Sequence, residues 1–129
     1  MDASQALAEL TELSSQVERA VVLDAGGTVL GSTGENADAA SELARAALDA
    51  ITAAGELHSS SGEVTRVEVE LAEGGLFVLR EGTRTIAATT GPNPTAGLVA
   101  YDLRTCLQGI DEEKPKRRRA KKKTEEGNE

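Results

Sequence analysis

Apolar residues recur at intervals of three and four in three stretches of the chain, and this spacing predicts three amphipathic helices. The first is expected over residues 3–18, the second over 38–54, and the third over about 96–107. The second carries many alanines, so it can pack closely on a sheet or on another helix. Residues that favour a helix start precede or open each stretch, and Gly55 is the expected end of the second helix. The residues at these starts are Asp2 with Gln5, Asp38 and Thr95.

Five shorter stretches have the pattern of β-strands. Residues 20–23, 76–79 and 85–89 are almost wholly apolar, as expected for central strands covered on both faces. Residues 28–32 and 64–71 are partly polar, which favours positions at the sheet edges. The clearest alternation runs from Thr65 through Val67, Val69 and Leu71 on one side, with Arg66, Glu68 and Glu70 on the other.

Glycine-containing turns separate consecutive strands, at Asp24–Gly27, Ala72–Gly75 and Glu81–Thr83. The elements therefore read α-β-β-α-β-β-β-α, an α+β fold. If hairpin neighbours pair and the partly polar strands lie outside, the five-stranded antiparallel sheet has the order 2-1-5-4-3, counting strands along the chain.

Charge divides the chain into a domain over residues 1–109 and a charged tail over 110–129. The first 110 residues hold 16 acidic and six basic side chains, whereas the last 19 hold six acidic and eight basic ones. The tail is expected to be disordered. It either solvates the protein and folds back on the acidic body, or binds nucleic acid, an anionic membrane or an acidic protein. Its basic residues are Lys114, Lys116, Arg117, Arg118, Arg119, Lys121, Lys122 and Lys123.

The remaining composition indicates the cellular compartment in which the protein is expected. A single cysteine, Cys106, excludes an internal disulfide framework and fits a reducing compartment. No apolar run approaches the roughly 20 residues that span a bilayer. The sequence therefore predicts a soluble, cytoplasmic protein.

Asp24 is the strongest catalytic candidate. Val21–Leu30, reading VVLDAGGTVL, resembles the first motif of haloacid-dehalogenase-type phosphatases, in which such an aspartate attacks phosphorus. The second acidic residue of that motif is replaced here by Gly26, and the body has no lysine to hold the phosphate. A hairpin turn is the better interpretation, so we expect no enzyme activity, no catalytic residue, no metal site and no cofactor.

Taken together, residues 1 to about 107 resemble the Roadblock/LC7 domain. The resemblance rests on the element order and on three local patterns: the first helix leading into AVVLDAGGTVLGS, the alanine-rich helix over 38–54, and Gly97-Leu98-Val99 with Leu103-Arg104 in the last helix. The tail lies outside it.

The resemblance implies that the first and third helices cover one face of the sheet and the second helix covers the other. It also implies dimers formed through the third strand and second helix, which join two sheets into one of ten strands. The alternating strand supports this expectation independently, because an unpaired edge invites pairing. The expected interface comprises Thr65, Val67, Val69, Ala40, Leu43, Ala44, Ala47 and Leu48.

Bacterial proteins similar to this one act beside small Ras-like GTPases, which they regulate by binding. The resemblance thus implies a homodimeric, non-enzymatic regulator or adaptor of such a GTPase. The alternative is a dimerisation scaffold that works through its basic tail, and a phosphatase with Asp24 as nucleophile is the third possibility.

Overall fold

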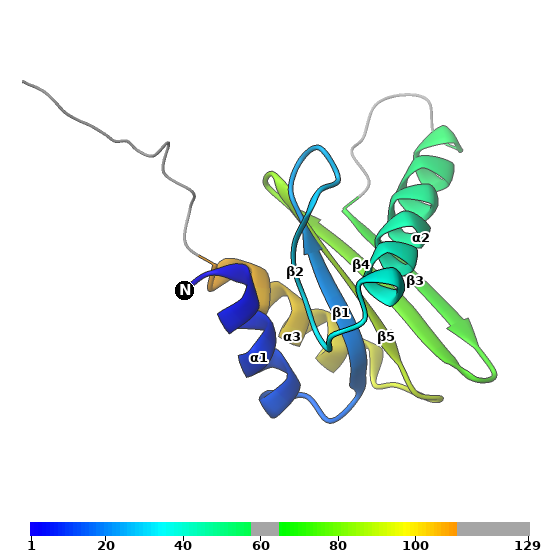
Figure 1. Ribbon diagram of the computed structural model, residues 1–129. Coiled ribbons are helices and arrows are strands. Elements are labelled where there is room, and N and C mark those ends of the chain that lie inside the picture. The colour runs from blue at the N-terminus through cyan, green and yellow to red at the C-terminus, as the bar shows by residue number, and fades with distance from the viewer. Residues whose placement is uncertain (58–64, 111–129) are drawn as a thin grey trace, which may run out of the picture.

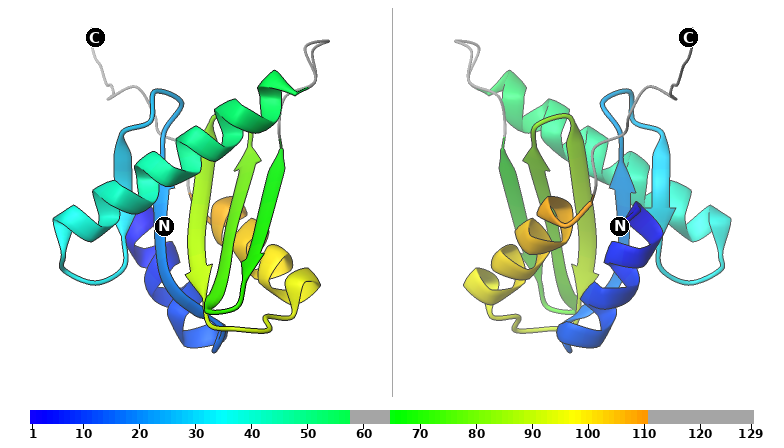
Figure 2. Two further views of the ribbon diagram at one scale, coloured as in Figure 1. Left: turned by 90° about the vertical axis from the view of Figure 1, so that its right-hand side faces the viewer. Right: turned by 90° about the vertical axis from the view of Figure 1, so that its left-hand side faces the viewer.

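The computed structural model describes residues 1–57 and 65–110. These residues form a central antiparallel sheet with α1 (Ala3–Leu13) and α3 (Ala96–Gln108) on one face and α2 (Ala37–Glu56) on the other (Figures 1 and 2). The strands are β1 (Val17–Leu23), β2 (Val29–Ser32), β3 (Arg66–Leu71), β4 (Gly74–Glu81) and β5 (Arg84–Thr90). The basic tail, from Asp111 onward, lies outside the described residues.

The order of strands in the sheet is β2-β1-β5-β4-β3, with antiparallel pairing throughout. This confirms the predicted fold class and sheet order. The nearly continuous apolar strands β1, β4 and β5 are central, and the partly polar β2 and β3 are the edges. The prediction was correct because a strand apolar on both sides must be covered on both faces.

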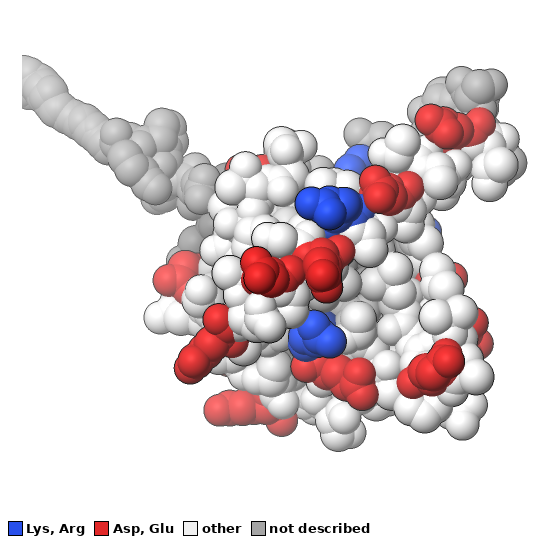
Figure 3. Space-filling view, turned by 45° about the vertical axis from the view of Figure 1, so that its right-hand side comes forward, with Lys and Arg blue, Asp and Glu red and all other residues white. Residues whose placement is uncertain are grey.

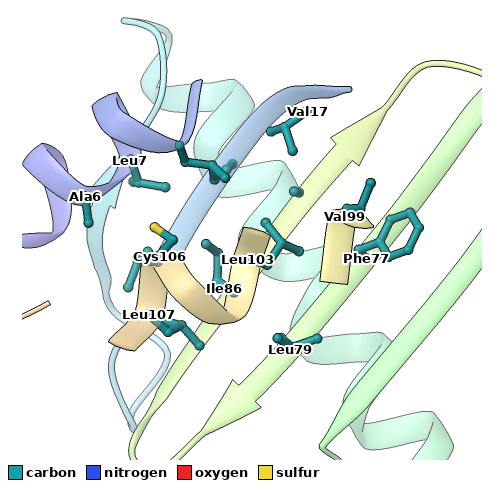
Figure 4. Packing of buried hydrophobic residues seen from close by; sticks show 14 of the residues in the cluster. Ala6, Leu7, Val17, Phe77, Leu79, Ile86, Val99, Leu103, Cys106 and Leu107 are labelled. Atoms are coloured by element: carbon teal, nitrogen blue, oxygen red, sulfur yellow. The ribbon is translucent and has the colours of Figure 1, made fainter. Parts of the chain in front are cut away.

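Two clusters of buried side chains hold the layers together. Under α1 and α3, the sheet contributes the inward side chains of β1, β4 and β5, among them Phe77, Leu79 and Ile86 (Figure 4). Under α2, Val21, Leu23, Val78 and Ala87 form the second cluster. The two sets alternate along each strand, so every central strand contributes to both cores.

The first helix is shorter than its apolar spacing predicts. It ends at Leu13, and Val17, which the expected helix over residues 3–18 included as an apolar position, instead opens β1 and is buried beside β5. At the start, Asp2 and Gln5 cap the helix as expected, in a capping box: the Gln5 amide donates to Asp2 Oδ1 at 2.8 Å and the Asp2 amide donates to Gln5 Oε1 at 3.0 Å. The spacing was ambiguous because one β-branched residue at the end of a stripe fits either a helix or a strand.

The ends of the other helices also differ from the sequence predictions. Asn36, not Asp38, caps α2, since Asn36 Oδ1 accepts from the Ala39 amide at 3.1 Å. Gly55 lies inside α2, which continues to Glu56. Thr95 does precede α3, but its side chain makes no capping bond; its amide donates to Gln16 Oε1 at 2.6 Å and so ties α3 to the loop before β1.

Candidate functional site: the free edge of the sheet beside α2

The outer edge of β3 is the most exposed part of the sheet. Among the described residues, β3 pairs with β4 on one side and with no strand on the other. Val67 is partly buried under α2, but Val69 and Leu71 are 37% and 64% exposed. An open edge that exposes apolar side chains favours pairing with another strand.

The two sides of β3 carry different chemistry. Val67 and Val69 pair with Val78 and Leu76, which lie in or against the cluster under α2. Arg66 and Glu68 pair with Leu79 and Phe77, whose side chains lie under α3, so the charged side of β3 faces that layer. Arg66 Nε lies 3.1 Å from Glu68 Oε2.

Four of the five α2 residues that sequence reasoning assigned to an interface lie in this chain's own core. Ala40, Leu43, Ala44 and Ala47 are buried against the sheet, and Leu48 packs at the margin of the same cluster. Their apolar stripe is therefore already covered in a single subunit. Val67 and Val69 lie on the open strand instead, and Thr65 directly precedes it. The sequence prediction therefore combined two sets of residues that differ in exposure.

A hollow of about 390 Å³ separates the first half of α2 from the β3–β4 hairpin. Its walls include Leu43, Ala46, Leu71, Leu76 and Thr89. Sequence reasoning missed this hollow, because it depends on how α2 crosses the sheet. Figure 3 brings the side that carries α2 and β3 forward, and there charged side chains lie scattered among uncharged surface.

A second groove, of about 420 Å³, runs between α1 and α3 on the opposite face. Its lining includes Leu10, Glu9 and Cys106, and the exposed side chains of Leu13, Leu98 and Tyr101. This groove also went unnoticed in the sequence. Leu98 was the available signal, since it lies beside the buried stripe of α3, whereas Leu13 follows the buried Leu7 and Leu10 at the same helical spacing.

Asp24 has a structural part in the β1–β2 turn. Its Oδ1 accepts hydrogen bonds from the amides of Gly26 and Thr28, each at 2.9 Å. Gly27 has a φ of 90°, the left-handed conformation that glycine accepts without strain. The predicted turn is present, and the carboxylate that a phosphatase would use as its nucleophile is bonded within it.

Cys106 is a buried thiol on α3. Burial, with a smaller contribution from the charge of Glu9, raises the pKa of Cys106 to about 11. The thiol is therefore protonated near neutral pH, which disfavours it as a nucleophile.

The described residues lack two features that would suggest other functions. No helix in residues 1–57 or 65–110 is long and apolar enough to cross a membrane. Within the same residues, no three His, Cys, Asp or Glu side chains gather as metal ligands would.

The model of the Roadblock/LC7 domain family matches residues 4–90, which run from the first turn of α1 to the end of β5. The chain belongs to the Roadblock/LC7 family. No curated protein matches it.

Solved Roadblock/LC7 structures have the same fold. A Roadblock/LC7 domain from Streptomyces avermitilis is 24% identical, with a TM-score of 0.72, over 84% of this chain and 93% of that one. A second domain from that organism is 26% identical, with a TM-score of 0.62, over 82% and 95%. The gliding protein MglB of Thermus thermophilus is 15% identical, with a TM-score of 0.67, over 81% and 82%. Membership of this family supports a role as a regulator or adaptor of the kind associated with GTPases.

Proposed function

We propose that this Roadblock/LC7 protein is a homodimeric, non-enzymatic regulator or adaptor of a small Ras-like GTPase. The observation that carries the proposal is the open edge of β3, which presents Val69 and Leu71 to solvent beside the hollow under α2. A subunit with such an edge at the end of a five-stranded sheet is suited to extend that sheet with a second copy.

In this dimer, β3 of each subunit pairs with β3 of the other, and both α2 helices lie on the same face of a ten-stranded sheet. Thr65, Val67 and Val69 form the contact, whereas Leu48 lies against Gly27 in the β1–β2 turn and supports α2 within its own subunit. Ala40, Leu43, Ala44 and Ala47 hold α2 against its own sheet, so they position the interface from within each subunit. One solved MglB structure is described as having a tetrameric arrangement.

The two α2 helices would then form the platform for the GTPase. The outward side of α2 carries Glu42, Arg45 and Asp49, all exposed, with small alanines between them. Small side chains allow a partner to approach the helix closely, and charged ones steer its orientation. Because Asp24 is bonded within its turn, regulation would come from binding and reshaping the GTPase rather than from a catalytic group of this protein.

The test uses the purified full-length protein and the small Ras-like GTPases of its source cell. We expect one GTPase to bind and to change its rate of GTP hydrolysis or of nucleotide release. Arg45→Glu should weaken that binding by about tenfold, as expected for a charge reversed within an interface. Arg104→Glu is the matched control, since Arg104 is also exposed but lies on α3, on the other face.

The second candidate, a scaffold acting through its tail, is favoured by the eight basic residues at 114–123. Replacing all eight by glutamine in the full chain separates the two functions. Regulation through the folded platform should survive the replacement. Loss of all GTPase binding in that variant, or failure of every small GTPase to bind the native chain, would contradict the regulator proposal.

A further inference from the structure

The order of charges along β3 specifies how two copies align. Resting on the dimer proposed above, we propose that the strands pair with a two-fold axis beside Val67. In this register Arg66 of each subunit lies directly opposite the partner's Glu68.

The backbone of β3 shows which groups are available for pairing. The Arg80 amide donates to the Thr65 carbonyl at 2.9 Å, so Thr65 is hydrogen-bonded toward β4. Hydrogen-bonded and non-hydrogen-bonded residues alternate along an antiparallel pair. The backbone groups of Val67 and Val69 are therefore also hydrogen-bonded toward β4. The amides and carbonyls of Arg66, Glu68 and Glu70 consequently point outward, away from β4.

Symmetry limits the possible registers. A two-fold axis that relates antiparallel neighbours is perpendicular to the sheet, so the same side of β3 faces the same way in both subunits. Opposite residues must then both be odd-numbered or both be even-numbered. The axis therefore passes beside a residue, and the candidates within β3 are the six residues from Arg66 to Leu71.

Electrostatics and the length of β3 distinguish these six registers. An axis at Arg66 places two arginines opposite each other, an axis at Glu68 or Glu70 places two glutamates opposite each other, and an axis at Val69 sets Glu68 against the partner's Glu70. Each of these arrangements has at least one like-charge pair, which is destabilising. An axis at Leu71 pairs no other residue of β3 with β3, because Ala72 already begins the turn to β4. Among the described residues, only the axis at Val67 sets unlike charges opposite each other without a like-charge pair, by placing Arg66 against the partner's Glu68 twice.

The other side of β3 fits the same register. Val67 would lie opposite the partner's Val67 and Thr65 opposite the partner's Val69, which extends the apolar cluster under α2 across the axis. Arg66 and Glu68 are half and one-third exposed. Because a guanidinium has five N–H donors, Arg66 can keep its own Glu68 and also bind the partner's.

Cysteine cross-linking measures the register directly. Val67 would form a non-hydrogen-bonded pair with Cα atoms roughly 4.5 Å apart, within the range that a disulfide spans. In full-length chains carrying Cys106→Ala, we expect Val67→Cys to form a covalent dimer under mild oxidation. Glu68→Cys and Val69→Cys should cross-link less than one-tenth as fast.

The outcomes separate this proposal from the one on which it rests. Faster cross-linking at Glu68→Cys or Val69→Cys, or a dimer that cross-links at none of the three positions, overturns the register and leaves the dimer in place. A native protein that is monomeric in sedimentation at micromolar concentration overturns both.

Charge reversal tests the same register without cysteine. Arg66→Glu and Glu68→Arg should each weaken dimerisation by about tenfold, because each creates two like-charge pairs. Combining them should restore the dissociation constant to within about twofold. With the axis at Glu68, the combined variant would instead set arginine against arginine at the axis and stay weak, which would overturn the assignment.

Discussion

The two edges of the sheet differ in length, exposure and cover. β2 has four residues, and Gly31 within it is buried where α1 crosses. Beyond its end, Thr33 bonds back to Ala20 through both its amide and its hydroxyl. β3 has six residues, of which five are exposed. Short, covered edges resist association, whereas long, apolar ones favour it.

This contrast shows that one sheet can have a closed edge and an open one. α1 contacts β2 because glycine at position 31 allows the helix backbone to approach the strand: a Cβ there would lie 3.1 Å from Ala3 Cβ and 3.2 Å from the Ser4 amide nitrogen. At β3, in the described part of the chain, α2 covers only the apolar side. The free backbone groups of β3 therefore remain for a partner.

The largest expected effect is on dimerisation and comes from placing a charge on the open edge. The same change on the closed edge is its control. Val69 on β3 and Val29 on β2 are 37% and 38% exposed, so the two valines are equally accessible in a single subunit. Val69→Asp should raise the dimer dissociation constant by at least 100-fold, because dimerisation would bury an unpaired carboxylate. Val29→Asp should leave it within about twofold, as measured by analytical ultracentrifugation. Equal effects of the two substitutions would show that the edges do not differ in this way.

An intermediate effect is expected where α1 closes the β2 edge. Gly31→Ala should lower the free energy of unfolding by about 2 kcal/mol, because the added methyl overpacks the contact with Ala3 and Ser4. Dimerisation should be unchanged. Urea denaturation measures the loss, and Gly97→Ala is the control, since nothing lies within 4 Å of a Cβ there. A stable Gly31→Ala protein would mean that α1 does not hold the β2 edge tightly.

The smallest effect is expected in the turn between β1 and β2. Asp24→Ala should cost about 1 kcal/mol of stability, because the amides of Gly26 and Thr28 lose their shared acceptor. Glu35→Ala, which removes an exposed acid in the segment after β2, serves as the control for charge. Hydrolysis of a generic phosphoester with Mg²⁺ that disappears in Asp24→Ala would instead revive the phosphatase interpretation.

Several features of this protein follow from its sequence. The spacing of apolar residues determined the order of helices and strands, and the contrast between wholly apolar and half-polar strands determined which lie at the centre. Alternation from Thr65 to Leu71 identified the edge strand. These predictions succeeded because a strand buried on one face has alternating apolar and polar residues, whereas a strand buried on both faces is apolar throughout.

Only the tertiary structure decided what covers each apolar side. The stripe of Ala40, Leu43, Ala44 and Ala47 fits a partner's helix as well as its own sheet, and the fold shows that the sheet covers it. Val17 fits the end of a helix or the start of a strand, and pairing with β5 decides for the strand. The physical reason is the same in both cases. Periodicity records that a side chain avoids water, whereas the neighbour that excludes the water is a distant part of the chain.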